Sequence, residues 1–272
     1  MLAAAYRWLS RRPLSTVHRL GAALGLAAWA ASGSYRRKLG ANLATAGYGS
    51  ARLRLRLAAA RHAGMLALEG AHVWLHALER TVARVDIPDW GPVERARAAG
   101  RGIVFLTPHL GAFEVTARCY ALHAPITVLY KPPRRANLRA LVEASRPHAN
   151  LLAAPATTGG VRALLRALRR GEAVGILPDQ VPDAGEGAWA PFFGRPAYTM
   201  TLPGRLARAS GAAVVLAVGE RLPGRGWRLH LEPLEAEPTP EAINAAMERL
   251  VRRFPEQYLW GYNRYRAPRG AS

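Results

Sequence analysis

A histidine and a glutamate stand five residues apart in TPHLGAFEV, residues 107–115. On one regular helix such a pair would point in different directions, because each residue turns the chain by about 100 degrees. Pro108 and Gly111 interrupt a helix, so His109 is expected in a loop and Glu114 in the first turn of the helix that follows. There the carboxylate can turn back, hold one imidazole nitrogen and leave the other free as a general base.

Elements that would position this pair follow from the pattern of apolar residues. Strands of buried length alternate with amphipathic helices, which predicts an α/β fold with a mixed, largely parallel sheet flanked by helices. The predicted strands cover residues 102–107, 125–130, 150–154, 172–179, 212–222 and 227–234. The predicted helices cover residues 114–123, 136–146, 159–171, 202–211 and 239–254.

Two polar segments follow predicted strands, the one around His109 and the segment PDQVPD at residues 178–183. Ligands of open α/β sheets bind at the carboxyl ends of strands, so both segments are candidates for a site. The second opens a long stretch rich in proline and glycine, residues 178–196, which we expect to be a functional loop. Its Trp189, Phe192 and Phe193 would either shape an apolar pocket or anchor the loop in the core.

Composition limits the partners and the chemistry. The chain of 272 residues carries 38 Lys and Arg against 18 Asp and Glu, a net charge of +20, which favours nucleic acid, an anionic membrane or acidic proteins. A single cysteine, Cys119, excludes an internal disulfide and a cysteine metal cluster. His72 and His76 lie four residues apart on a predicted helix, but no zinc motif accompanies them, and we predict no metal and no cofactor.

The N-terminus is basic and partly apolar. Leu20 to Ala31 is apolar, lies between arginines, and is shorter than the roughly 20 residues that span a bilayer. We expect residues 1–34 to form a helix on the cytoplasmic face of the membrane, with arginines at the headgroups. A cleaved signal peptide and a buried helix of a soluble domain are the alternatives. The remaining chain, residues 35–272, would be helical to residue 90 and α/β from 91 to 272.

Several blocks of the chain resemble the bacterial lipid A biosynthesis acyltransferases, the lauroyl and myristoyl branch of the lysophospholipid acyltransferase superfamily. In order, they are NLATAGY, TPHLGAFE with its H-x4-[DE] motif, YKPPRRANL, EASRP, GILPDQVPDAGEGAWAPFFGRPAYT and PEQYLWGYNRYR. The similarity covers nearly the whole chain. The Pro-Asp-Gln block and the PEQYLW ending are far more specific than the histidine and glutamate alone.

This resemblance implies a glycerol-3-phosphate acyltransferase-like fold and a reaction. The family moves a fatty acyl group from acyl-acyl carrier protein to a hydroxyacyl chain of a lipid A precursor, at the cytoplasmic face of the inner membrane. His109 matches the base of the family and Glu114 its partner. The residues implied in substrate binding are Lys131, Arg146, Asp179 and Gln180. Lys131 stands where the family has arginine and loses the bidentate fork, with Arg134 and Arg135 as substitutes.

Two other readings stay open at this point. The same fold and pair could act on another glycolipid or on a lysophospholipid, because the loops that choose the acceptor are not decoded by one sequence. A basic membrane-binding or nucleic-acid-binding protein without catalysis is the other class. That class predicts a missing pair or a missing Pro-Asp-Gln loop, and both are present.

Overall fold

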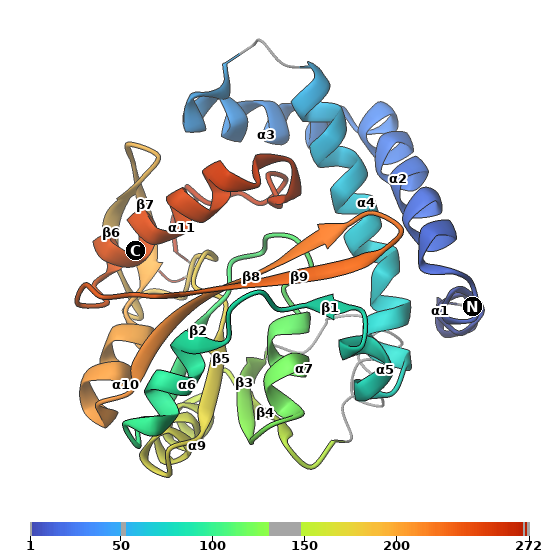
Figure 1. Cartoon of the computed structure of the whole chain (residues 1–272). Helices are drawn as coiled ribbons and strands as arrows, with labels where there is room; N and C mark the ends of the chain where they lie inside the picture. Colours follow the sequence, from blue (N-terminus) through green and yellow to red (C-terminus); the bar gives the residue numbers. More distant parts are fainter. Residues whose placement is uncertain (1, 50–52, 131–147, 269, 271–272) are drawn as a thin grey trace.

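The computed structural model describes residues 2–49, 53–130, 148–268 and 270. It has the predicted α/β fold, a mixed and mostly parallel sheet with helices on both faces (Figure 1). The predicted helix over residues 136–146 lies outside the described residues.

Within these residues the main sheet has seven strands in the order β1-β9-β8-β2-β5-β3-β4. Every neighbouring pair is parallel except β8 and β9, which are antiparallel. The strands are β1 (Val85–Asp86), β2 (Ile103–Leu106), β3 (Ile126–Tyr130), β4 (Leu151–Pro155), β5 (Ala173–Ile176), β8 (Ala213–Leu222) and β9 (Gly226–Pro233).

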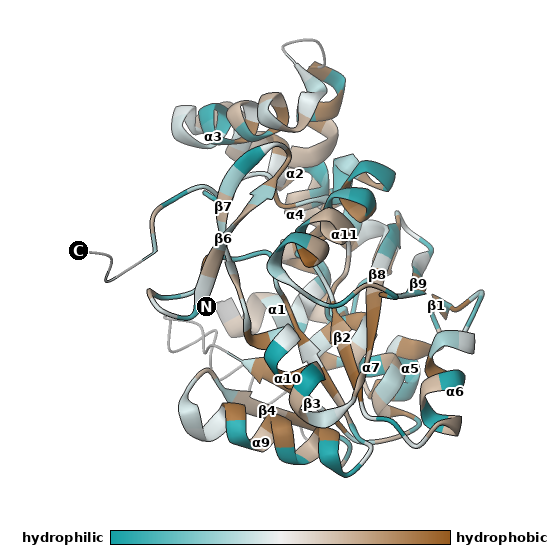
Figure 2. Ribbon diagram, turned by 90° about the vertical axis from the view of Figure 1, so that its left-hand side faces the viewer, coloured by the Kyte–Doolittle hydropathy of each residue, from teal (hydrophilic) through white to brown (hydrophobic). Residues whose placement is uncertain are grey.

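Helices cover the two faces in two groups. The first face holds α5 (Leu78–Val82), α6 (Gly91–Ala98) and α7 (Val115–Ala121), and the second holds α9 (Thr158–Arg169), α10 (Leu202–Ser210) and α11 (Pro240–Arg253). Strand β2 is buried along its whole length because its side chains alternate between these two layers. The apolar colouring accordingly concentrates on the central strands (Figure 2).

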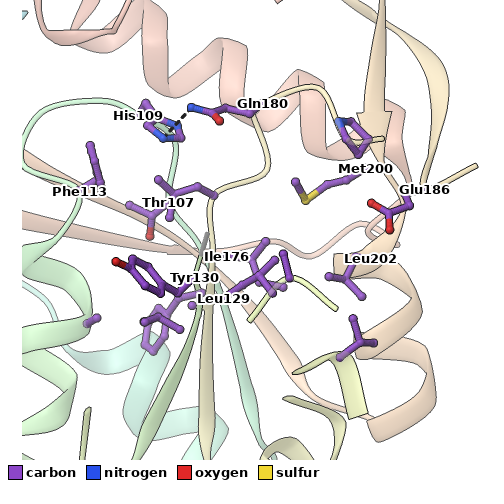
Figure 3. A pocket seen from close by; sticks show the side chains of 18 of the residues that line it. Thr107, His109, Phe113, Leu129, Tyr130, Ile176, Gln180, Glu186, Met200 and Leu202 are labelled. Atoms are coloured by element: carbon purple, nitrogen blue, oxygen red, sulfur yellow. Dashed lines mark hydrogen bonds between the residues drawn. The ribbon is translucent and has the colours of Figure 1, made fainter. Parts of the chain in front are cut away.

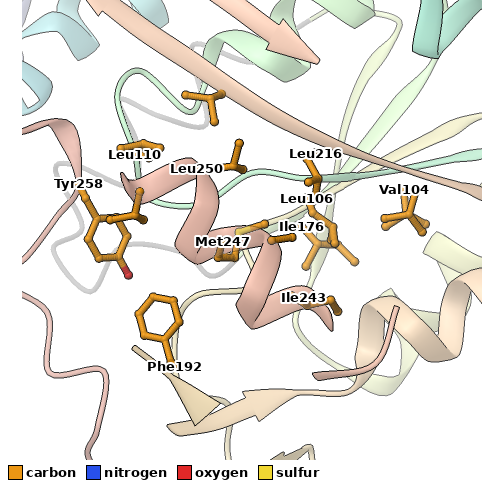
Figure 4. Close-up of a cluster of buried hydrophobic side chains, with 14 of the residues drawn as sticks. Val104, Leu106, Leu110, Ile176, Phe192, Leu216, Ile243, Met247, Leu250 and Tyr258 are labelled. Carbon is orange, nitrogen blue, oxygen red and sulfur yellow. The ribbon is translucent and has the colours of Figure 1, made fainter. Parts of the chain in front are cut away.

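The larger part of the core lies under α11. Ile243 and Met247 of this helix share a cluster with Leu106 and Leu216 of the sheet (Figure 4). Thr239 caps the helix by accepting a hydrogen bond from the backbone N–H of Ala242, as the Thr-Pro start of the predicted helix indicated.

The predicted loop over residues 178–196 is only partly a loop. Its second half forms a β-hairpin with the residues that follow, β6 (Gly187–Phe192) and β7 (Arg195–Met200). The alternation of small and aromatic residues suits a strand, and the proline and glycine content concealed it. Phe192 and Phe193 are buried in the core, so these two residues anchor the hairpin, whereas Trp189 is 53% exposed and does not.

The N-terminal third is helical: α1 (Leu2–Ser10), α2 (Leu14–Ala31), α3 (Gly33–Leu43), a π-helical turn (Ala44–Tyr48) and α4 (Leu53–Leu75). None of the described helices is long and apolar enough to cross a bilayer. Helix α2 packs along α4 instead, with Val17, Gly21 and Gly25 on its buried side. The division of the chain at residue 34 stays a prediction.

Glycines set the distance between α2 and α4. A Cβ atom built on Gly25 would stand 2.0 Å from the carbonyl oxygen of Ala60, and one on Gly64 would stand 2.0 Å from that of Gly21. The two backbones therefore touch where a side chain would hold them apart.

We expect Gly25→Ala to lower the free energy of unfolding by about 1–3 kcal/mol, because the added methyl group forces the two helices apart. Gly40→Ala is the matched control. A Cβ atom there meets only the Arg56 guanidinium, at 3.5 Å, so this change should stabilise α3 by about 0.5–1 kcal/mol. Denaturant unfolding measures both, and equal stability of the two variants would contradict the close contact.

Candidate active site

The site begins with the register of two strands that are distant in sequence. Parallel strands β2 and β5 pair Leu106 with Ile176, and the backbone N–H of Thr107 donates to the carbonyl of Ile176 at 3.0 Å. Three residues beyond each member of that pair stand His109 and Asp179. The carboxyl ends of adjacent parallel strands thus bring the two predicted segments together.

The His109 imidazole is held by the Asp179 carboxylate. His109 Nδ1 lies 2.8 Å from Asp179 Oδ1, and the His109 backbone N–H donates to Oδ2 at 2.9 Å. Asp179 is only 3% exposed. Burial alone would raise the pKa of Asp179, but the charge that His109 carries when protonated, together with its hydrogen bonds, outweighs burial and lowers that pKa below its usual value. The carboxylate is therefore ionised and fixes the orientation of the ring.

Gln180 contacts the second nitrogen of the imidazole, Nε2. Its side-chain amide nitrogen lies 3.0 Å from His109 Nε2 (Figure 3). An amide nitrogen can only donate, so Nε2 accepts, and the proton of the neutral ring is on Nδ1, facing Asp179. Nε2 therefore carries the free electron pair that a general base needs.

Tyr258 completes the surroundings of Asp179. Its hydroxyl is buried against the carboxylate, and burial and then the charge of Asp179 raise the pKa of Tyr258 well above its ordinary value. The phenol stays protonated and can donate to the carboxylate. Sequence reasoning missed this residue as a site residue, although it lies in the PEQYLW block that carried part of the resemblance.

Glu114 does not make the contact that the spacing suggested. It is the residue before α7, with helical φ and ψ of −68° and −21°. Its carboxylate forms no hydrogen bond with any described residue, and Nδ1 of His109 is bonded to Asp179 instead. The functional pairing of Glu114 with His109 therefore stays a prediction, while the contact at Nδ1 is made by Asp179. Glu114 lies instead in the wall of the pocket beside His109.

Backbone hydrogen bonds on both sides fix the loop that carries His109. The His109 carbonyl accepts from Leu259 N–H at 3.1 Å, and Ala112 N–H donates to the Gly219 carbonyl at 2.7 Å. Gly111 has a φ of +60°, as its place in the break had indicated, and a Cβ atom there would stand 2.1 Å from the Gly219 oxygen. Only glycine fits this turn.

A buried ion pair between Arg221 and Glu69 also holds this loop, through a hydrogen bond to the Gly111 carbonyl. The Arg221 guanidinium donates through Nε to Glu69 Oε2 at 2.8 Å and through Nη2 to the carbonyl of Gly111 at 3.0 Å. Arg221 and Glu69 are 1% exposed. Burial alone raises the pKa of Glu69, but the charge and hydrogen bonds of Arg221 prevail and lower it to about 2. Helix α4 and strand β8 are thereby joined at the active-site turn.

Three further side chains satisfy this pair. His18 of α2 and Trp227 of β9 each bind Glu69 Oε2 at 3.1 Å, and His62 Nδ1 lies 3.2 Å from Arg221 Nη1. Burial and then Arg221 lower the pKa of His62 to about 4, so its neutral ring accepts from the guanidinium. No single sequence signal identifies this network, because its members are far apart along the chain.

A pocket of about 840 Å³ opens beside His109. Its interior is apolar, with Phe105, Ile126, Val128, Leu129 and Ile176, and its polar lining includes Asp183, Glu186, Arg205 and Arg266. Figure 3 shows Leu129 and Ile176 below His109 and Gln180. The arrangement fits a molecule with a long apolar chain whose polar end reaches the imidazole.

The remaining predicted site residues divide in two. Gln180 lines the pocket and Asp179 is buried behind it, bonded to His109. Lys131 and Arg146, with Arg134 and Arg135, lie outside the described residues. His72 and His76 stack with ring centroids 4.5 Å apart, and in the described part of the chain no group of three metal-binding side chains includes them.

Comparison with known proteins identifies what this site belongs to. The model of the family described as bacterial lipid A biosynthesis acyltransferase matches residues 1–267. The chain belongs to this family. It is therefore an acyltransferase, and the resemblance of its blocks is confirmed.

Individual members of this family are less than 30% identical to the chain. The chain is 28% identical over 214 residues to the lipid A biosynthesis palmitoleoyltransferase of Escherichia coli K12, covering 76% of this chain and 69% of that protein. The lauroyltransferase of the same organism is 27% identical over 212 residues, with 75% and 69% covered. A lipid A biosynthesis acyltransferase of Haemophilus influenzae is 28% identical over 179 residues, with 62% and 55% covered.

Arg221→Met should lower the free energy of unfolding by about 3–5 kcal/mol, because it leaves the Glu69 charge buried without a counter-ion. Arg228→Met is the matched control on the neighbouring strand. Its ion pair with Asp86 is exposed and should contribute less than about 1 kcal/mol. Chemical denaturation measures both at pH 7.

Chemical denaturation at a series of pH values tests whether the Glu69 charge is the source of this stability. The pKa of Glu69 falls from 4.5 unfolded to about 2 folded, so its contribution is complete above pH 4.5 and is lost as pH falls toward 2. Glu69→Gln should flatten this part of the stability profile. An unchanged profile would show that the pair does not hold the fold.

Proposed function

We propose that this acyltransferase moves a fatty acyl chain from acyl-acyl carrier protein to a hydroxyacyl group of a lipid A precursor, with His109 as general base. The observation that carries the proposal is the oriented imidazole at a large apolar pocket. His109 bonds through Nδ1 to the buried Asp179, and its Nε2 faces the side of Gln180. A base and a chain-binding cavity are the two things that this reaction needs.

The reaction would run in two steps. The acceptor hydroxyl displaces the Gln180 amide from Nε2 of His109, gives its proton to that nitrogen and attacks the thioester carbonyl carbon. The new carbon–oxygen bond gives a tetrahedral intermediate. Its collapse breaks the carbon–sulfur bond, and the imidazolium returns the proton to the leaving thiolate. Asp179 stabilises the imidazolium between the steps.

Glu114 is the second carboxylate of this proposal. It stays our candidate partner of the catalytic histidine in the family sense, but it faces the pocket and not Nδ1. Lys131 and Arg146 remain proposed contacts of the substrate phosphates, supported by their match to the family blocks.

The net positive charge of the chain supports the choice of both proposed substrates. Acyl carrier protein is acidic, and lipid A precursors carry phosphates, so a chain of net charge +20 attracts them. No metal or cofactor is required in this proposal, because the thioester is already activated for transfer.

The outer face of α2 supports a position on the membrane. Leu20 and Leu24 are 42% and 49% exposed on the side of the helix away from α4, and Trp8 of α1 is 48% exposed. The Arg12 guanidinium lies 4.5 Å from the Trp8 ring centroid. Apolar side chains beside arginines are typical of an interfacial helix. We propose that residues 1–34 lie on the cytoplasmic face of the inner membrane.

Leu24→Glu should reduce binding to vesicles of anionic phosphatidylglycerol by at least about tenfold, because it removes one buried apolar side chain from the lipid contact. Leu152→Glu is the matched control, a leucine that is 45% exposed on β4. Co-sedimentation gives both values. Equal loss in the two variants would place the membrane contact elsewhere.

The reaction itself is tested by a transfer assay with Asp179→Asn, Glu114→Gln and His109→Ala. We expect Asp179→Asn to lower kcat by about 10²–10⁴-fold, since the amide cannot hold the ring in the same way. Donors are carrier proteins loaded with ten to sixteen carbons, and acceptors are a tetra-acylated lipid A precursor and a lysophospholipid. A folded His109→Ala with full activity would overturn the mechanism.

The two carboxylate variants decide between partners. A larger loss in Asp179→Asn than in Glu114→Gln supports the geometry given above, and the reverse order supports the pairing that the spacing suggested. Transfer to the lysophospholipid alone would keep the mechanism and replace the acceptor.

A further inference from the structure

Helix α9 presents a row of arginines to solvent. Arg162, Arg166 and Arg169 are all exposed, and their spacing of four and three residues places them along one side of the helix. The opposite side, with Gly160, Leu164, Ala167 and Leu168, is buried against the sheet. Arg205 of the adjacent helix α10 is exposed as well. We call these four arginines the α9 arginine surface.

Among the described residues, these arginines differ from their neighbours in that no carboxylate forms an ion pair with them. Arg170 pairs with Glu172 and Arg208 pairs with Glu237. Among the described residues, no acidic side chain pairs with any member of the α9 arginine surface. Four like charges on two adjacent helices repel one another. An anionic partner that binds to this surface relieves the repulsion and is attracted by all four charges.

The α9 arginine surface begins at the pocket. Thr157, Thr158 and Val161, at the start of α9, line the pocket that holds His109, and so does Arg205. From this rim the arginines lead away along the helix toward Arg169. A partner lying on them has one end at the pocket entrance.

A lipid surface fits this face less well than a protein does. None of the exposed large apolar side chains belongs to α9 or α10, whereas Leu20 and Leu24 belong to α2. Helix α9 has no aromatic residue on which a nucleic-acid base could stack.

We propose that the α9 arginine surface is the docking site for the acidic carrier protein that delivers the acyl chain. This inference rests on the proposed function, which names that donor. The carrier protein lays an acidic helix along Arg162, Arg166 and Arg169. Its prosthetic arm passes Arg205 at the rim and places the acyl chain in the apolar pocket, with the thioester near His109.

Docking on exposed charges changes the association rate of the donor more than the rate of the chemical step. Exposed charges steer an oppositely charged partner and raise its association rate by about 10–10³-fold at low salt. KM for the carrier-bound donor should therefore rise with ionic strength, because salt screens exposed charges. The chemical step at His109 does not involve these arginines, so kcat stays the same.

The test compares two triple variants of the full chain. Arg162→Glu/Arg166→Glu/Arg169→Glu reverses the row on α9. Arg80→Glu/Arg95→Glu/Arg97→Glu makes the same charge change at exposed positions on α5 and α6, which cover the other face of the sheet. Each protein is assayed with one acyl chain on two donors, the acyl carrier protein and free pantetheine. Thermal unfolding shows that both variants are folded.

We expect the α9 variant to raise KM for acyl-acyl carrier protein by about tenfold or more at low salt, with little change in kcat. Its KM for acyl-pantetheine, which carries no acidic protein, should match the unaltered enzyme. The α5 and α6 variant should change KM for the carrier protein by less than about threefold.

Three results would overturn the docking site. One is an unchanged KM for the carrier protein in the α9 variant, and another is an equal rise in the control variant. The third is a loss of binding to phosphatidylglycerol vesicles with the carrier KM unaffected, which would make α9 a membrane face. If the unaltered enzyme transfers from neither donor, the proposed function itself has failed, and the docking site fails with it.

Discussion

The ion pair between Arg221 and Glu69 is the interaction on which the rest of the structure depends. Two opposite charges buried together are tolerated only when their remaining hydrogen-bonding groups are satisfied. The guanidinium meets this need with the carbonyl of Gly111, and the carboxylate meets it with His18 and Trp227. The pair thereby fixes helix α4, the N-terminal helix α2, two strands of the sheet and the active-site turn relative to one another.

A second buried carboxylate, Asp179, has a partner that is charged only when it is protonated, the imidazole of His109. Glu69 faces Arg221, which is always charged, so the charge of Glu69 is neutralised even when no substrate is bound. Asp179 faces an imidazole whose neutral ring already donates from Nδ1. In the proposed reaction, the attraction in this pair becomes full only when His109 takes a proton from the acceptor. The first carboxylate therefore serves the fold, and the second is suited to stabilise a charge that exists only during the reaction.

Two outer surfaces complement this interior. The exposed leucines of α2 lie on helices that the buried ion pair joins to the active-site turn, and the α9 arginine surface begins at the pocket entrance. The membrane-bound acceptor and the soluble donor that we propose would reach the enzyme from two directions. Separate apolar and basic surfaces around one pocket suit this arrangement, because lipid and protein partners then do not compete for the same face.

The sequence by itself indicated six strands of the main sheet, all but β1, and the helices α7, α9, α10 and α11. It also indicated the break at Gly111 and the two segments that carry His109 and Asp179, because these follow from local periodicity and from residues with special backbones. The hairpin within residues 178–196 was hidden by its glycine and proline content. The order of the strands was decided only by tertiary structure, since a parallel neighbour is not encoded in local spacing. The pairing of β2 with β5 placed Asp179, 70 residues away, on His109 in place of the nearby Glu114. The contact of Arg221 with Glu69 joins residues 152 apart, and it exists because burial leaves each charge only the other as its counter-ion.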